Sequence, residues 1–256
     1  MEFSRRIMQM QASPIRRLIP YAEEAKRKGR KVFHLNIGQP DIVTPPSFFE
    51  ALRDFRSDVL AYAPSEGIPE LLDAIRGYYK KYDVELGREN ILVTDGASEA
   101  IVFAFTALCD PGDEILIPEP FYANYNPFAE SVSAVIVPIT TKAEEGFHLP
   151  SRQVLESKIS PRTKAIVLCH PGNPTGAIYT AEEMAMVADL AKKHDFFIIA
   201  DEVYREFVYD GIPYRSFASL KGVEDRVVIM DSISKRYSAC GARVGCVISF
   251  AAQAST

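Results

Sequence analysis

From about residue 90 onward, short apolar segments alternate with segments whose apolar residues recur at helical spacing. Short apolar segments of this kind are typical of strands, and their alternation with helices predicts a mainly parallel sheet covered by helices. The seven predicted strands are Ile91–Thr94, Glu114–Ile117, Ala134–Ile139, Lys164–Cys169, Phe196–Ala200, Val227–Met230 and Val244–Ser249.

One helix between two of these strands has a clear start. Thr180-Ala-Glu-Glu183 is a capping-box sequence, in which the Thr180 side chain caps the helix and Glu183 reaches back to the Thr180 backbone. Apolar residues at helical spacing continue to His194, and the strand Phe196–Ala200 follows at once. This stretch is therefore predicted to complete a strand–helix–strand unit.

The first ninety residues have a different pattern. A helical pattern covers Pro14–Lys28, a proline-rich loop covers Gln39–Pro46, and a second helix is predicted over Ile68–Tyr82. This region is predicted to form an arm and a partial second layer.

The composition of the 256 residues is that of an ordinary globular protein, with 47% hydrophobic and 25% charged residues. The formal net charge of −5 gives no basic surface for nucleic acid or for an anionic membrane, so a small substrate is favoured. No apolar run approaches the roughly 20 residues that a membrane span needs, and the segment from Met1 lacks the apolar core of a signal peptide. A cytoplasmic location is therefore expected.

The cysteines carry no signal for a metal site. None of the four belongs to a Cys-x-x-Cys pair. Cys109 and Cys169 lie in apolar runs, so buried thiols are expected and no metal is predicted.

Polar residues that directly follow the predicted strands are the candidates for chemistry, because ligands of open α/β sheets bind at the carboxyl ends of the strands. After the first strand, the turn Gly96-Ala97-Ser98 leads into a helix, whose free N–H groups favour an anion such as phosphate. After the fourth strand, two prolines and two glycines hold Asn173 in a rigid loop.

Two further strand ends carry ionisable residues. Asp201 and Tyr204 follow the fifth strand, where a buried carboxylate needs a cation or hydrogen bonds, and Lys235 and Arg243 follow the sixth. Taken singly, these features have ordinary explanations, with Asp201 as a helix N-cap, Lys235 as a solvated lysine and the Gly-Ala-Ser sequence as a simple turn. Taken together, they predict a cofactor site, because lysine amines form Schiff bases with carbonyls and pyridoxal phosphate is the cofactor most often held that way.

At these residues the chain resembles the class I and II aminotransferases of pyridoxal-phosphate fold type I, and within them the aspartate aminotransferase-like branch. The resemblance runs from about residue 14 to about residue 249. The matching segments are Asn36-Ile-Gly38-Gln-Pro-Asp, Tyr62-Ala-Pro-Ser-Glu-Gly-Ile-Pro-Glu-Leu, Pro171-Gly-Asn-Pro-Thr-Gly176, Ala200-Asp-Glu-Val-Tyr204 and Ser232-Ile-Ser-Lys, followed after seven residues by Arg243-Val-Gly.

The resemblance implies an α/β fold in three layers, with a mainly parallel seven-stranded sheet between helices on both faces. Residues 1–45 would form an N-terminal arm and part of the small domain, and residues 46–256 would form the large domain that binds pyridoxal phosphate. The rest of the small domain, with the arginine that binds the substrate α-carboxylate, is expected to be absent, because the chain is shorter than members of this family. Impaired turnover of the chain by itself is therefore expected.

The resemblance also implies roles for single residues. Lys235 would form the Schiff base with pyridoxal phosphate and later move a proton between the substrate Cα and the cofactor. Asp201 would pair with the pyridinium nitrogen, and Asn173 and Tyr204 would hydrogen-bond the phenolic oxygen of the ring. Lys235, Asp201 and Tyr204 are the catalytic residues of this hypothesis.

Further residues would bind the cofactor and the substrate. Tyr122 would stack on the ring, at a position where the aspartate-specific branch usually has tryptophan. Gly38 would offer a backbone donor near the substrate carboxylate, in a substrate site shared with Tyr122 and Asn173. The phosphate would be bound by Ala97, Ser98, Ser232, Arg243 and, from the neighbouring subunit of a homodimer, Tyr62.

The implied function is transfer of an amino group between an amino acid and a 2-oxo acid, as in aspartate aminotransferase. A truncated module that binds pyridoxal phosphate without turnover, a carbon–sulfur lyase and a cyclopropane-forming synthase are alternatives that would use the same pocket. A serine hydrolase is a more distant alternative, because Ser98 stands between a strand and a helix. No histidine follows His194 to complete the usual order of Ser98, Asp201 and histidine.

Overall fold

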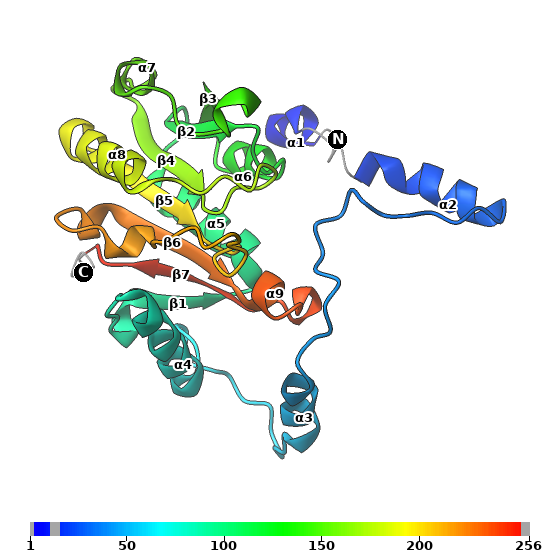
Figure 1. Cartoon of the computed structure of the whole chain (residues 1–256). Coiled ribbons are helices and arrows are strands. Elements are labelled where there is room, and N and C mark those ends of the chain that lie inside the picture. The colour runs from blue at the N-terminus through cyan, green and yellow to red at the C-terminus, as the bar shows by residue number, and fades with distance from the viewer. Residues whose placement is uncertain (1–2, 11–15, 252–256) are drawn as a thin grey trace.

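The computed structural model describes residues 3–10 and 16–251, and a seven-stranded sheet lies at its centre (Figure 1). All seven predicted strands are confirmed, each with its ends within two residues of the prediction. The strands are β1 (Ile91–Thr94), β2 (Glu114–Glu119), β3 (Val135–Thr140), β4 (Thr163–Cys169), β5 (Phe197–Asp201), β6 (Val227–Ser232) and β7 (Gly245–Ser249).

The strand order is β1-β7-β6-β5-β4-β2-β3. Strands β2 to β6 pair in parallel, which confirms the predicted type of sheet, whereas β7 is antiparallel to both of its neighbours, β1 and β6. The carboxyl ends of β1 and of β4 to β6 therefore meet at one edge of the sheet, and β7 begins at that same edge. This edge brings together the segments that carry the predicted chemistry.

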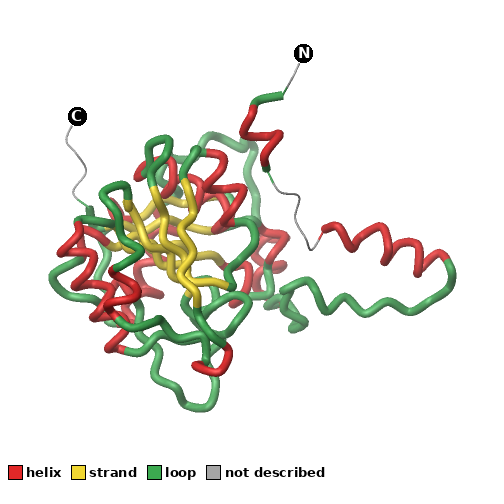
Figure 2. The backbone as a smooth tube through the Cα atoms, turned by 90° about the horizontal axis from the view of Figure 1, so that it is seen from above, coloured by secondary structure: helices red, strands yellow, loops and turns green. Residues whose placement is uncertain are grey.

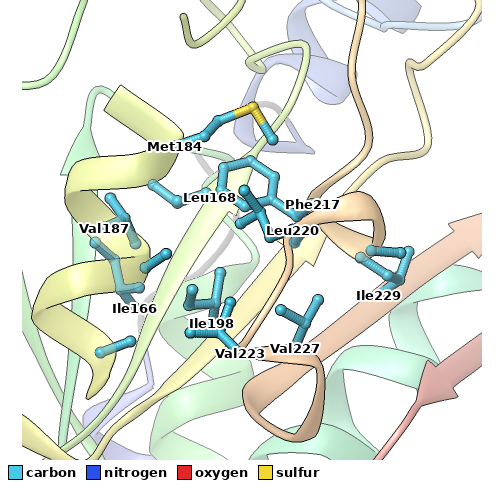
Figure 3. Packing of buried hydrophobic residues seen from close by; sticks show 14 of the residues in the cluster. Ile166, Leu168, Met184, Val187, Ile198, Phe217, Leu220, Val223, Val227 and Ile229 are labelled. Atoms are coloured by element: carbon cyan, nitrogen blue, oxygen red, sulfur yellow. The ribbon is translucent and has the colours of Figure 1, made fainter. Parts of the chain in front are cut away.

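Helices cover both faces of the sheet, so there are two hydrophobic cores. Along β5, Ile198 and Ala200 belong to one core and Ile199 belongs to the other, as the alternation of side chains in a strand requires. Helices α4 (Pro69–Tyr79) and α8 (Ala181–His194) pack on the first face, and Figure 3 shows Met184 and Val187 of α8 over the strands. Helices α5 (Gly96–Leu108) and α6 (Tyr125–Ser131) pack on the second.

The predicted capping box at the start of α8 is confirmed. The Thr180 hydroxyl accepts a hydrogen bond from the Glu183 N–H at 3.2 Å, and the Glu183 carboxylate accepts one from the Thr180 N–H at 2.7 Å. The same carboxylate also accepts a hydrogen bond from the Leu149 N–H at 2.6 Å. Glu183 therefore links the start of α8 to the loop that contains Leu149. The short helix α7 (Arg152–Glu156) follows this loop.

The amino-terminal region lies beside the sheet rather than within it. Helix α2 (Ile19–Arg27) falls within the first predicted helix, whose residues 14 and 15 lie outside the described residues. The helix predicted over residues 68–82 is present as α4 followed by one 3-10 turn. Helices α1 (Arg5–Gln9) and α3 (Pro46–Asp54) were not predicted.

Residues before α4 form few contacts with the sheet. In the part of the chain that the structure describes, no residue before Leu72 is buried. Figure 1 shows α2, α3 and the extended segment between them projecting away from the strands, and Figure 2 shows the projection of α2 from above. One attachment is a hydrogen bond of 2.6 Å from the Thr44 hydroxyl to the Ser238 carbonyl oxygen. Over the described residues, no helix is both long and apolar enough to cross a membrane.

Candidate active site

Lys235 lies at the carboxyl edge of the sheet, in the short helix α9 (Ile233–Arg236) that follows β6. This helix starts where it does because the Ser232 hydroxyl accepts a hydrogen bond from the Ser234 N–H at 2.9 Å. The Lys235 Nζ donates to the Gly38 carbonyl oxygen at 2.6 Å and lies 5.8 Å from the centre of the Tyr204 ring. The fold thus brings a primary amine, a phenol and the Gly38 backbone together from three separate segments.

Asp201 is the last residue of β5, and its side chain is almost fully buried. One carboxylate oxygen accepts a hydrogen bond of 2.7 Å from the Tyr125 hydroxyl, and the other accepts one of 3.3 Å from the Val203 N–H. Burial raises the pKa of Asp201 from 3.8 to about 6, because desolvation disfavours the charged form. Among the described residues, Asp201 forms no ion pair that would balance its charge.

Tyr125 contacts Asp201 but was not among the residues predicted from the sequence. It begins α6, three residues after Tyr122, and its ring meets the Tyr122 ring edge to face at 5.5 Å. That spacing places both tyrosines on one side of a helical turn, which was the available signal. Because only the folded chain places α6 over the end of β5, the partner of Tyr125 could not be named beforehand.

Two phenols, Tyr122 and Tyr204, lie near Asp201, and the Asn173 amide lies in the loop after the neighbouring strand β4. Burial raises the pKa of Tyr204 and also that of Tyr122, whose hydroxyl accepts a hydrogen bond of 2.7 Å from the Asn124 side chain. Both phenols therefore keep their protons at neutral pH and can donate hydrogen bonds. Asn173 lines a small cavity of about 20 Å³ together with Tyr125.

A candidate corner for an anion lies where α5 begins. Gly96 is the first residue of α5, Ala97 and Ser98 follow in the same turn, and the N–H groups of a first turn have no partner within the helix. A Cβ atom added to Gly245 would lie 2.5 Å from the Gly96 carbonyl carbon and 2.7 Å from the Ala97 nitrogen. Only glycine at residue 245 allows β7 to pass so close to this turn.

Arg243 adds a cation to this corner. Its Nη2 donates to the Asp95 carbonyl oxygen at 3.2 Å, and its Nε lies 3.4 Å from the Asp95 carboxylate. Its Nη1 donates to the Cys240 carbonyl oxygen at 3.1 Å, and because the side chain remains about half exposed, the remaining N–H groups can reach a ligand. Ser232 is close by, because it pairs with Gly245 in the β6–β7 ladder.

Tyr62 is the one predicted site residue that lies apart from the others. Its side chain is fully exposed on the segment between α3 and α4. All the other predicted residues lie at or next to the carboxyl edge, where β7 and the loops after β2, β4, β5 and β6 meet the start of α5 and the Gly38 segment.

One edge of the sheet thus carries an amine, a buried carboxylate without a cation and a corner for an anion. These features define the class of protein, an α/β protein with a lysine-centred site for a small ligand. The family model described as aminotransferase class I and II matches residues 30–255. The chain therefore belongs to the class I and II aminotransferases, as the sequence motifs predicted.

Relatives and solved structures agree with this family. The chain is 36% identical to an asparagine–oxo-acid transaminase of Streptococcus mutans over 95% of its own length and 63% of the relative. It is 38% identical to a probable aspartate/prephenate aminotransferase of Aquifex aeolicus over 94% of the chain and 62% of the relative. An aspartate aminotransferase structure from Thermotoga maritima superposes with a TM-score of 0.91 at 34% identity, over 97% of this chain and 66% of that one.

The chain thus spans a little over three fifths of the length of these curated relatives. The superposition supports the predicted fold, a seven-stranded α/β sheet between two layers of helices. The predicted division at residue 45 stays a prediction.

Proposed function

We propose that this chain provides the pyridoxal-phosphate site of an enzyme that transfers an amino group from an amino acid to a 2-oxo acid. The observation that carries the proposal is the meeting of Lys235, Asp201 and the Arg243 corner at one edge of the sheet. Family membership and the names of the relatives support the same reaction.

The residues of the site fit this cofactor. Asp201 is buried with hydrogen bonds only from a phenol and a backbone N–H, and its pKa is raised to about 6. A protonated ring nitrogen would supply the missing cation and restore the charged form of the carboxylate. The start of α5 and Arg243 offer donors to a phosphate, and the glycines at residues 96 and 245 leave no side chain in the way.

When bound, pyridoxal phosphate supplies an aldehyde that forms Schiff bases with amines and a ring that accepts the electron pair of a broken Cα–H bond. Lys235 would hold the cofactor through its Nζ and, once that nitrogen is free, take the proton from the substrate Cα. Asp201 would keep a proton on the ring nitrogen. Tyr204 and Asn173 would donate hydrogen bonds to the phenolic oxygen, and Tyr122 would cover the ring face.

The remaining predicted residues would bind phosphate and substrate. Ser232 and Arg243 would hold the phosphate together with the first turn of α5, which contains Ala97 and Ser98. The Gly38 segment would contact the substrate carboxylate, since it already lies against Lys235. An aspartate-like donor is proposed from the relatives.

A second copy of the chain is proposed as the partner. Tyr62 is fully exposed and stands apart from the site of its own chain. In a homodimer it would reach the phosphate of the other subunit, so each site would use residues of both chains. An equilibrium sedimentation experiment that found only monomer in the presence of cofactor would contradict this arrangement.

The proposed function is tested by trapping the cofactor. The purified chain, mixed with pyridoxal phosphate, should develop a visible absorption band that borohydride removes, and peptide mass spectrometry should locate the pyridoxyl group on Lys235. A Lys235→Met variant is the control and should show no stable band. Attachment mainly at another lysine would overturn the site. Trapping at Lys235 without transfer between aspartate and a 2-oxo acid would instead support the alternative of a binding module without turnover.

A further inference from the structure

Four charged side chains gather on the inner side of the site residues, in a set that we term the buried charge cluster. Each of its members is the immediate sequence neighbour of a proposed site residue. The cluster consists of Glu202 beside Asp201, Arg205 beside Tyr204, Asp231 beside Ser232, and Arg236 beside Lys235.

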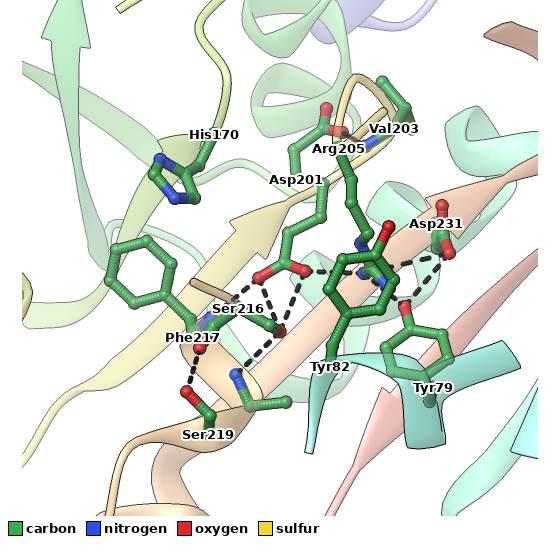
Figure 4. Close-up of polar contacts among 12 residues, drawn as sticks. Tyr79, Tyr82, His170, Asp201, Val203, Arg205, Ser216, Phe217, Ser219 and Asp231 are labelled. Carbon is green, nitrogen blue, oxygen red and sulfur yellow. Dashed lines mark hydrogen bonds and ion pairs between the residues drawn. The ribbon is translucent and has the colours of Figure 1, made fainter. Parts of the chain in front are cut away.

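Arg205 is at the centre of this cluster. Its side chain is fully buried, and its Nη2 donates to the Glu202 carboxylate at 2.5 Å and to the Tyr79 hydroxyl at 2.7 Å. The same nitrogen lies 3.8 Å from the Asp231 carboxylate. Figure 4 shows the Arg205 side chain extending from the loop after Asp201 toward Asp231. One guanidinium thus links the ends of β5 and β6.

The two carboxylates of the cluster are also held by neutral donors. Glu202 accepts hydrogen bonds from the Ser216 hydroxyl at 2.9 Å and from the Phe217 N–H at 2.8 Å. Asp231 accepts from the Tyr79 hydroxyl at 3.0 Å and forms an ion pair with Arg236. Two buried anions therefore face two buried cations, and the cluster has no net charge.

Aromatic rings pack against the two guanidinium groups of the cluster, and Asp231 and Arg236 also line a pocket of about 170 Å³. The Arg205 guanidinium lies 4.2 Å from the centre of the Tyr79 ring and 4.9 Å from that of Tyr82. The Arg236 guanidinium lies 4.2 Å from the Tyr78 ring. Because these side chains are buried, water screens their charges only weakly. A change in the net charge of the cluster therefore acts on ionisable groups nearby.

We infer that Arg205 is a positioning residue for the candidate site. By neutralising Glu202 and Asp231, it holds the ends of β5 and β6 together and prevents these two carboxylates from placing a net negative charge next to Asp201.

Electrostatics at Asp201 support this role. The charges of Asp231 and Glu202 both raise the pKa of Asp201, so a cation in contact with both of them opposes that effect. Without it, Asp201 would hold its own proton more tightly and would pair less well with a cationic ring nitrogen. The titratable groups around Asp201 are Tyr125 from α6, Tyr122 before it, Cys169 from β4, Asp231 from β6, and Glu202 and Tyr204 after β5.

The test measures the ionisation of Asp201 in the cofactor-free chain. The free energy of unfolding is determined in urea between pH 4.5 and 8 for the parent and for Asp201→Asn, and the difference between the two curves changes as Asp201 ionises. The same pair is then measured with Arg205→Met, Arg205→Lys or Glu202→Gln added. The pH at which this difference levels off reports the pKa of Asp201 in the folded chain, and we term it the titration midpoint. It is expected to rise by about one pH unit with Arg205→Met, to fall with Glu202→Gln and to stay near the parental value with Arg205→Lys.

A role in packing alone would lower stability without moving the midpoint. Unchanged midpoints in both Arg205→Met and Glu202→Gln would overturn the inference, and if Arg205→Met does not fold, Glu202→Gln decides by itself. The inference rests on the proposed function for the task of Asp201, but this measurement requires no cofactor. Unchanged midpoints together with cofactor trapping at Lys235 would contradict the inference alone. Shifted midpoints without trapping at Lys235 would contradict only the proposed function.

Discussion

Asp201, whose role in the site is proposed, lowers the stability of the cofactor-free fold at neutral pH. Its pKa in the folded chain is about 6, compared with the ordinary value of 3.8, so the folded state binds the proton more tightly than the unfolded state. The stability that this group contributes is present below pH 3.8 and is lost as the pH rises through about 6. At neutral pH the cofactor-free chain therefore contains a carboxylate that its surroundings disfavour.

Replacing Asp201 by asparagine should stabilise the cofactor-free chain at pH 8. Since the two pKa values differ by about 2 units, the gain in the free energy of unfolding is expected to be up to about 3 kcal/mol. The gain should shrink as the pH falls toward 4, where the aspartate is neutral in the folded state but still about half ionised in the unfolded state. Urea unfolding at both pH values checks this, and a variant less stable than the parent at pH 8 would contradict it.

At the scale of elements, α8 depends on the polar contacts at its start. Thr180 caps the helix, whereas Glu183 accepts hydrogen bonds from both the Thr180 N–H and the Leu149 N–H of the loop before α7. Thr180→Ala should lower the free energy of unfolding by about 1 kcal/mol. Glu183→Ala should lower the free energy of unfolding by more than Thr180→Ala does, because two N–H groups lose their acceptor. Chemical denaturation checks this order, with Thr180→Ser as the control that keeps the hydroxyl.

The position of α5 also depends on its close contact with β7. A Cβ at Gly245 would lie between 2.5 and 2.8 Å from backbone atoms of Gly96, Ala97 and Asp231, and backbone cannot move aside as a flexible side chain can. Gly245→Ala should therefore destabilise the chain by about 1–3 kcal/mol. It should also weaken binding of pyridoxal phosphate, because it displaces the first turn of α5.

The matched control for this change is Gly241→Ala. A Cβ added to Gly241 would have no heavy atom within 4 Å, leaving aside its immediate chain neighbours. Its effect on stability should be within about 0.5 kcal/mol. If the two variants had equal stability and equal affinity for the cofactor in a fluorescence titration, the close approach of β7 to α5 would not matter for the site.

The whole molecule combines a well-packed sheet with an exposed amino-terminal region. Leu35 and Leu60 in that region are 95% and 89% exposed, which is unusual for leucine in a folded protein. Such a surface fits the proposed contact with a second copy of the chain. Its cost is a tendency to associate unspecifically.

The purified chain should therefore bind a hydrophobic dye. Replacing both Leu35 and Leu60 by serine should reduce the dye fluorescence at an unchanged free energy of unfolding, because neither side chain is packed. Gln39→Ser, on the same exposed segment, is the control and should leave the fluorescence as it was. No dye binding by the parent chain would show that this surface is covered in solution.

The sequence by itself determined the strands, the capped helix α8 and the location of Lys235, Asp201, Asn173 and Arg243 after strand ends. These features are local: apolar runs mark strands buried on both faces, and a capping box needs only four consecutive residues. The family motifs then indicated the roles of these residues. Nothing beyond neighbouring residues was required for this part.

Only the tertiary structure placed β7 between β1 and β6, set Tyr125 against Asp201 and gathered the buried charge cluster. Arg205 and Tyr79 are 126 residues apart in the chain, and Tyr125 and Asp201 are 76 apart. Which buried polar groups become partners depends on how all the layers pack, because each group takes the donor or acceptor that the surrounding elements bring within reach. A local pattern shows that a residue is polar and follows a strand, and only packing decides what it contacts.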